Sequence, residues 1–409
     1  MGRGKALAAG FAGALCALIV AGACPGLAAA AECTNNWTGA AEGAWQTAGN
    51  WSAGHAPNSG DVACIGSGKT VNVTAGTNQA AVVQGEGTLR IKESTLELLS
   101  STEASSIKNL SIQYKANLTG PATISVSNAF AWTHESTMSG TGATIVGPSA
   151  TGSITTGGGW AGLKERRLVT EGTFAINEGI LSLTEGAILE NKGTLTINHE
   201  AGTFDILDGG GTKRPKLVNA GILRKTAGTG ETNLDVAVEN KGEVDAQTGT
   251  FGFTLAGASN VLASGSTMKG SLYLSKGSFA AGSFNAGGAT IQVREATVNV
   301  ASGNTATFGT LVMDFNALLT GSGTFEIGKA LTWKSESKMA GSGSTVLKSS
   351  ATANVTTYSG RLAQRTFVNE GTFTLEGEGS IRASEGATFK NEATVNANAV
   401  ESPRASPAS

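Results

Sequence analysis

Two aspartates close together in the middle of the chain form the pattern that comes nearest to a site for chemistry. Asp205 and Asp208 are followed by Lys213 and Arg214 in the segment 204–214. Two carboxylates at a suitable separation can act as acid and base on a glycosidic bond, and carboxylate oxygens also bind calcium. The alternative is a solvated loop. A glycine motif that repeats along the chain is spaced more widely at this point than elsewhere, which favours the loop. The sequence leaves the catalytic, calcium or sugar-binding and loop interpretations open.

Three of the six tryptophans gather near the N-terminus, at Trp37, Trp45 and Trp51. Their rings could form a platform for sugar rings, because an aromatic face is both flat and apolar. The alternative is that they form the small core of a cap. Trp132 and Trp333 occupy equivalent places in two copies of a longer repeat. A structural role explains that equivalence more simply than a duplicated ligand site.

Other residue types offer little chemistry. His55, His134 and His199 are isolated, and none has a partner at metal-ligand spacing. No serine stands in a nucleophile elbow with acid and histidine partners. We therefore expect no metal, no cofactor, no catalytic residues and no enzymatic activity.

The first residues have the form of a targeting segment. Residues 1–5 are cationic, 6–23 are apolar and 27–31 are small. This order predicts a signal peptide over 1–31 that is removed on export. The alternatives are an uncleaved membrane anchor and a lipid-anchored start at Cys24. No second apolar run follows, so we expect a mature chain without a membrane span, secreted or at the cell surface.

Cys33 and Cys64 are the cysteines that remain after that segment. An even pair in an exported chain predicts a disulfide, and the alternative is two free thiols. The bond would close a loop of about 30 residues, worth about 3–4 kcal/mol by loop entropy. Together with the tryptophans it predicts a small N-terminal cap over 32–84.

A short motif, here called the phrase, recurs along the rest of the chain: a small or polar residue, any residue, glycine, and then β-branched or apolar residues, as in 191–195. Its glycines at 172, 193, 221 and 242 lie 21, 28 and 21 residues apart, and it returns at Gly371. Between these turns run strands of four or five residues with alternating apolar and polar side chains, such as 194–197. A period in the twenties indicates one unit stacked on itself. We predict an all-β, right-handed parallel β-helix of about 15 coils.

The phrase also predicts local structure at each turn. The asparagines two residues before the turn glycine should stack as an amide ladder inside the bend. The glycines should adopt the left-handed conformation that lets the backbone turn. The ladder positions are Asn191, Asn240, Asn369 and Asn391.

A longer duplication divides the β-helix, predicted over 85–400. Blocks 85–200 and 286–400 are copies, because 118–120, 131–133 and 137–140 match residues 201 positions later. Residues 201–285 are a different insert between them. Residues 401–409, rich in serine and proline, predict a disordered tail.

The whole-chain composition excludes some partners. Of 409 residues 58 are glycine, charged residues make up 15%, and the net charge is −2. Low charge without a basic face argues against nucleic acid as a partner.

The phrases around Trp132 and Trp333, the glycine turns and Gly186–Asn191 resemble repeats of large secreted bacterial parallel β-helix proteins, of the pectate-lyase-like and adhesin-like kinds. The resemblance covers about 85–400. It implies an exported structural or adhesive module that presents a rigid surface to cell-surface polysaccharide or other envelope components, with self-association as a further expectation. The alternative that it implies is a carbohydrate-active enzyme, a pectin-lyase-like polysaccharide lyase or hydrolase.

Overall fold

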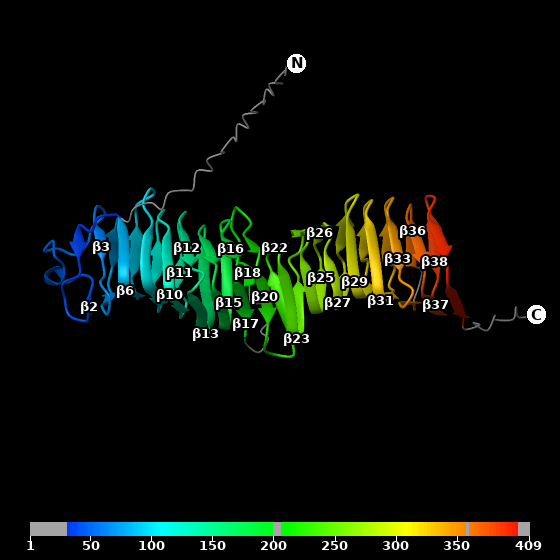
Figure 1. Ribbon diagram of the computed structural model, residues 1–409, viewed down its shortest axis with the longest axis horizontal. Helices are drawn as coiled ribbons and strands as arrows, with labels where there is room; N and C mark the ends of the chain where they lie inside the picture. The colour runs from blue at the N-terminus through cyan, green and yellow to red at the C-terminus, as the bar shows by residue number, and fades with distance from the viewer. Residues whose placement is uncertain (1–30, 199–205, 357–359, 400–409) are drawn as a thin grey trace, which may run out of the picture. The chain divides into compact units, whose positions relative to one another are not determined.

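The computed structural model describes residues 31–198, 206–356 and 360–399. Residues 1–30 of the predicted signal peptide and the predicted tail lie outside these residues. From Glu32 onward the described residues form an all-β parallel β-solenoid of about 16 turns, shown in Figure 1. The predicted fold class is confirmed, and the number of turns is close to the predicted 15.

Each complete coil crosses three faces, which we name A, B and C, and strands pair in parallel with the coils before and after. The strands that lie entirely on face A are β3 (Val62–Cys64), β12 (Ala143–Val146), β14 (Arg167–Thr170), β16 (Ile188–Asn191), β19 (Lys216–Asn219), β22 (Ala237–Asn240), β24 (Ser259–Leu262), β26 (Ser278–Ala281), β28 (Thr297–Val300), β30 (Leu318–Thr320), β32 (Lys338–Ala340), β35 (Gly360–Ala363) and β38 (Ile381–Ser384). The strands that lie entirely on face B are β4 (Thr70–Val73), β17 (Thr194–Ile197), β20 (Ile222–Lys225), β33 (Ser344–Leu347), β36 (Thr366–Asn369) and β39 (Thr388–Asn391). The strands that lie entirely on face C are β5 (Thr77–Ala80), β7 (Thr95–Leu98), β9 (Asn117–Thr119), β11 (Thr137–Met138), β18 (Ile206–Asp208), β21 (Glu231–Asp235), β34 (Thr352–Val355), β37 (Thr372–Gly377) and β40 (Thr394–Ala399).

Longer strands bend from one face into the next. From face A into face B run β6 (Val82–Lys92), β8 (Ser105–Gln113) and β10 (Ile124–Thr133). From face B into face C run β13 (Thr151–Lys164), β15 (Thr173–Thr184), β23 (Glu243–Phe253), β25 (Thr267–Ser275), β27 (Asn285–Arg294), β29 (Thr305–Asp314) and β31 (Thr324–Trp333).

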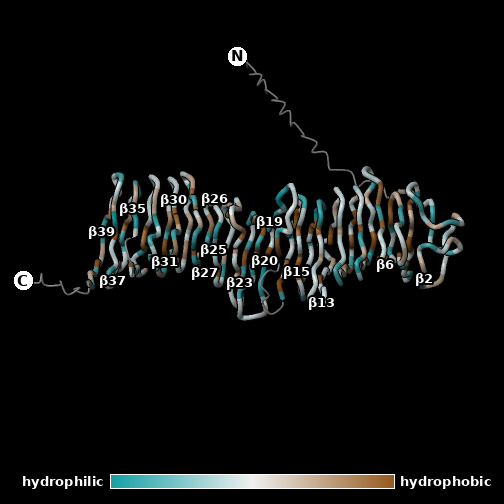
Figure 2. Tube along the Cα trace, turned by 180° about the vertical axis from the view of Figure 1, so that it is seen from behind, coloured by the Kyte–Doolittle hydropathy of each residue, from teal (hydrophilic) through white to brown (hydrophobic). Residues whose placement is uncertain are grey.

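The alternating pattern places the core inside the coils. In β17, Leu195 and Ile197 are buried while Thr194 and Thr196 remain partly exposed. The same alternation appears in Figure 2 as teal and brown segments along each strand. Since successive side chains of a strand point to opposite sides, one apolar stripe per strand fills the interior of the stack.

The predicted amide ladder is confirmed at the end of face A. Asn191 Nδ2 donates to Asn219 Oδ1 at 2.8 Å, and Asn219 Nδ2 donates to Asn240 Oδ1 at 2.8 Å. A second ladder joins Asn369 Nδ2 to Asn391 Oδ1 at 2.7 Å. In the first ladder the buried Nδ2 groups of Asn191 and Asn219 are satisfied in this way, whereas Asn240 Nδ2 at its end is buried without a hydrogen-bond partner among the described residues.

The predicted conformation of the turn glycines is wrong. Gly193, Gly221 and Gly242 do not have a positive φ. Glycine is needed there because the corners stack closely: a Cβ on Gly221 would lie 2.0 Å from the carbonyl oxygen of Gly193, and one on Gly242 would lie 2.1 Å from that of Gly221. Close approach of two backbones, rather than backbone rotation, excludes a side chain.

The two copies of the duplication are rotated by one face. β10 bends from face A into face B, whereas its counterpart β31 bends from face B into face C. Likewise β11 lies on face C and its counterpart β32 on face A. Equivalent residues of the two copies therefore point in different directions around the solenoid.

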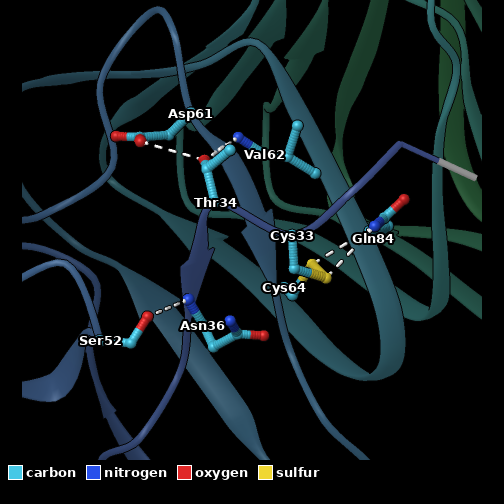
Figure 3. Close-up of a disulfide and its surroundings, with 8 residues drawn as sticks. All are labelled: Cys33, Thr34, Asn36, Ser52, Asp61, Val62, Cys64 and Gln84. Carbon is cyan, nitrogen blue, oxygen red and sulfur yellow. Dashed lines mark hydrogen bonds between the residues drawn. A yellow bond between two sulfur atoms is a disulfide. The ribbon is translucent and has the colours of Figure 1, made fainter.

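The N-terminal end carries β1 (Asn35–Asn36), β2 (Glu42–Ala44) and the short 3-10 helix η1 (Ala48–Asn50). The predicted Cys33–Cys64 disulfide is present, as Figure 3 shows, and Gln84 Nε2 lies 3.4 Å from both sulfur atoms. β1 pairs with β3, which pairs with β6, so this end is stacked directly on the first coils.

Candidate functional site

A groove of about 460 Å³ on the outward side of face C contains the only tryptophan exposed to solvent. Trp160 is 46% exposed, whereas the other five tryptophans of the chain are at most 6% exposed. It stands near the centre of β13, where its neighbours Ala161 and Leu163 point into the core. The groove is lined by Thr137, Trp160, Gly162, Lys164, Ile180, Ser182, Thr184 and Leu207.

The groove combines a flat apolar surface with hydroxyl groups. A Cβ on Gly162 would lie 2.7 Å from Cζ3 of Trp160 and 3.1 Å from Oγ1 of Thr137, so the indole packs directly against the Gly162 backbone. Ser182 and Thr184 stand beside it on β15. An exposed ring flanked by a few polar groups is the arrangement that binds a ligand with one apolar face and a polar rim, such as a sugar ring.

A second groove of about 430 Å³ lies at the adjoining corner of the same coils. Tyr114 and His134 stack there with ring centroids 4.2 Å apart, and Lys92 Nζ lies 5.0 Å from the Tyr114 ring. Glu135 packs against Gly159, immediately before Trp160, since a Cβ on that glycine would lie 3.0 Å from Glu135 Cγ. Polar and aromatic groups therefore continue around the corner from the Trp160 groove.

Two carboxylates stand at the other end of the Trp160 groove. Asp208 follows Leu207 in β18, and Leu207 pairs with Asp235 of β21. Burial raises the pKa of Asp235, the neighbouring carboxylate of Asp208 raises it further, and Lys276 opposes the shift. Of the two aspartates singled out from the sequence, Asp208 thus lies next to the groove, and Asp205 lies outside the described residues.

The segment after Asp208 is held to the preceding coil. The Glu185 carboxylate accepts hydrogen bonds from the backbone N–H of Thr212 at 3.1 Å and from its hydroxyl at 2.9 Å. These bonds, the backbone one first, lower the pKa of Glu185. Arg214 Nη1 lies 4.0 Å from Asp208. This ordered surface turn agrees with the loop interpretation of the segment.

The three N-terminal tryptophans form a packed cluster. Trp51 contacts both Trp37 and Trp45 edge to face at 5.1 Å, and its Nε1 donates to the Trp45 carbonyl oxygen at 2.8 Å. All three are buried. Their burial favours the cap-core role over the sugar platform, which stays a prediction. Trp132 and Trp333 are fully buried as well, and each donates its Nε1 to a serine carbonyl oxygen, in agreement with a structural role.

Trp160 was not among the residues singled out from the sequence. One signal could have found it. It is a large aromatic residue, whereas the other copy has Ser359 at the matching place. A tryptophan that only one copy retains is not required by the shared fold.

Some site types find no support in the part of the chain that the structure describes. No group of three or more His, Cys, Asp or Glu side chains there could hold a metal ion. Within the same residues no helix has the length and apolar character needed to cross a membrane.

Comparison of the chain with protein-family models, curated proteins and solved structures returns no match. The bacterial, pectate-lyase-like or adhesin-like identity therefore stays a prediction, and the function has to be argued from the surface itself.

Proposed function

We propose that this chain is an exported, non-enzymatic solenoid that acts as a structural or adhesive module by binding polysaccharide of a cell surface or matrix. The solenoid fold is compatible with adhesive and polysaccharide-binding roles, and the disulfide is compatible with a location outside the cytoplasm. The observation that supports the proposal most is Trp160, exposed in a groove of hydroxyl-bearing side chains.

The test uses affinity electrophoresis of the purified chain through gels that contain xylan, mannan, hydroxyethyl cellulose or polygalacturonate. We expect at least one of these polysaccharides to retard the chain. In Trp160→Ala the apparent affinity for that polysaccharide should fall at least about tenfold, because the variant removes the stacking surface. Phe315→Ala is the matched control: Phe315 is also an exposed aromatic residue, 48% exposed, but it lies at a corner of another coil. No retardation in any gel, or equal retardation of the two variants, would overturn the proposal.

The second candidate is a carbohydrate-active enzyme. Asp208 and Asp235 favour it, since a carboxyl whose pKa is raised beside another carboxylate is the usual arrangement of an acid and base pair. Release of reducing ends from the same polysaccharides, abolished in Asp208→Asn, would support the enzyme, whereas no release at any enzyme concentration would leave the binding module.

A further inference from the structure

Face C carries a second outward groove further along the stack. It has a volume of about 300 Å³ and centres on Tyr273 of β25. Tyr273 points outward between the buried Leu272 and Leu274 and is partly exposed, less so than Trp160. The groove is lined by Glu231, Thr250, Ser271, Leu272, Tyr273, Thr290, Gln292, Arg294 and Val312.

Strand pairing places the two aromatic residues in one column. Trp160 pairs with Ile180, which precedes Leu181, and Leu181 pairs with Ile206. Ile206 pairs with Leu234 of β21. Asn233, which precedes Leu234, pairs with Gly252, and Gly252 pairs with Tyr273. Trp160 and Tyr273 therefore occupy the same outward position, five coils apart.

The column sets a distance and a direction for a ligand. Neighbouring coils are separated by about 4.8 Å, so the two rings lie about 24 Å apart along the solenoid axis. This rise per coil is close to the length of one sugar residue in an extended chain. A linear glycan that lies along the column can thus reach both rings.

The chemistry between and around the rings favours an uncharged chain. Thr250, Ser271 and Gln292 offer hydroxyl and amide groups near Tyr273. The charged side chains are of both signs: Glu231 and Arg294 line that groove, Lys164 lies near Trp160, and Asp208 and Asp235 stand at the end of the Trp160 groove. No single sign of charge dominates, so a polyanion would gain little on this face.

We propose that face C binds a linear, uncharged polysaccharide along the solenoid axis, with aromatic subsites at Trp160 and Tyr273. The proposal rests on the polysaccharide-binding function and adds the geometry of the ligand. Two subsites on one chain make the second contact intramolecular, so affinity should rise once an oligosaccharide is long enough to reach both.

The experiment titrates the full chain with trisaccharides and octasaccharides of the cello, xylo, manno and chito series. Calorimetry gives affinity and stoichiometry, and the fluorescence of Trp160, the only exposed tryptophan, reports its subsite. In at least one series we expect two trisaccharides per chain but one octasaccharide, bound at least about tenfold more tightly. Tyr273→Ala should bring the octasaccharide to the affinity of the trisaccharide and leave the fluorescence response intact. Tyr273→Phe, which keeps the ring, should retain the length dependence.

The outcomes separate this inference from the function on which it rests. Equal affinity for both lengths, or a length dependence that Tyr273→Ala leaves unchanged, overturns the two-subsite geometry while polysaccharide binding at Trp160 stands. Retention in polygalacturonate gels alone, with no response to any neutral series, overturns the uncharged class. Binding of no oligosaccharide and no polysaccharide overturns both proposals.

Discussion

Two arginines are fully buried in the solenoid, and neither forms an ion pair with a carboxylate among the residues that the structure describes. Arg166 and Arg365 occupy equivalent places in the two copies, and each donates hydrogen bonds from all three guanidinium nitrogens. The acceptors of Arg365 are Thr345 Oγ1 and the carbonyl oxygens of Gly321, Gly323, Ala340 and Ser344, at 2.6–3.1 Å. One side chain thereby ties together the corners of three coils, and its full set of five donors offsets the cost of burying a charge.

We expect Arg365→Lys to lower the free energy of unfolding by about 2–5 kcal/mol, because lysine has three donors for five acceptors and leaves buried carbonyl oxygens unsatisfied. Burial lowers the pKa of Arg365 to about 10, so the charge persists well above neutral pH. A depressed pKa means that burial of the charge costs stability below that value and that the cost fades only as the pH rises through it. The effect of the substitution should therefore be the same at about pH 6 and about pH 8.

Urea unfolding followed by circular dichroism measures both expectations. Arg361→Lys is the control, since Arg361 is half-exposed and pairs with the exposed Glu336, and its effect should stay within about 0.5 kcal/mol. Similar midpoints for the two variants would contradict the role given to the buried guanidinium.

At the scale of the strand and corner, stacking distance explains where glycine is required. The corner glycines approach the carbonyl oxygen of the preceding coil, whereas some glycines in strands have open space around them. Gly288 is an exposed example in β27 with no atom within 4 Å of a Cβ and no positive φ. Only the first kind is fixed by the repeat.

We expect Gly221→Ala to destabilise the protein by about 1–3 kcal/mol, since the new methyl group would overlap the Gly193 oxygen and force two coils apart. Gly288→Ala should be neutral or stabilise by up to about 1 kcal/mol, because it only restricts the unfolded chain. Thermal unfolding of the two variants compares them directly. A Gly221→Ala variant as stable as Gly288→Ala would show that the corner can relax around a side chain.

At the scale of the whole chain, the period of the repeat predicts the stack because a fixed spacing returns each strand to its neighbour. Thr170, Asn191, Asn219 and Asn240 pair in successive coils, as their equal place in the phrase requires. The disulfide and the amide ladders follow from the same reasoning. These features depend on residue type and spacing alone, and so they could be predicted.

Other features depend on how many faces the chain has crossed. Met138 and Met339 match in sequence but lie on faces C and A, because the chain between them does not complete a whole number of coils. The outward position of Trp160 is likewise set after Gly157, Gly158 and Gly159, which carry no side chains to mark the phase of the strand. The outward position could not be predicted for this reason, although the difference between the two copies marks Trp160 in the sequence.

The N-terminal end offers the prediction that belongs to the whole stack. In a solenoid each coil contacts only its neighbours, so a change at one end should stay local. Cys33–Cys64 closes the end where β1, β3 and Gln84 meet, far along the stack from Trp333. We expect the double variant Cys33→Ser/Cys64→Ser to lose the loop constraint, worth about 3–4 kcal/mol, mainly in the first coils.

Amide hydrogen exchange locates the effect. In the double variant, exchange in β3, β4 and β5 should accelerate at least about tenfold, while exchange in β31 and β34 should stay unchanged. Ser52→Ala, which removes only the acceptor of the Asn36 N–H drawn in Figure 3, should leave all of these strands within about twofold of the parent chain. Faster exchange along the entire stack would mean that the coils unfold as one cooperative unit, and that the disulfide stabilises the whole solenoid rather than its end.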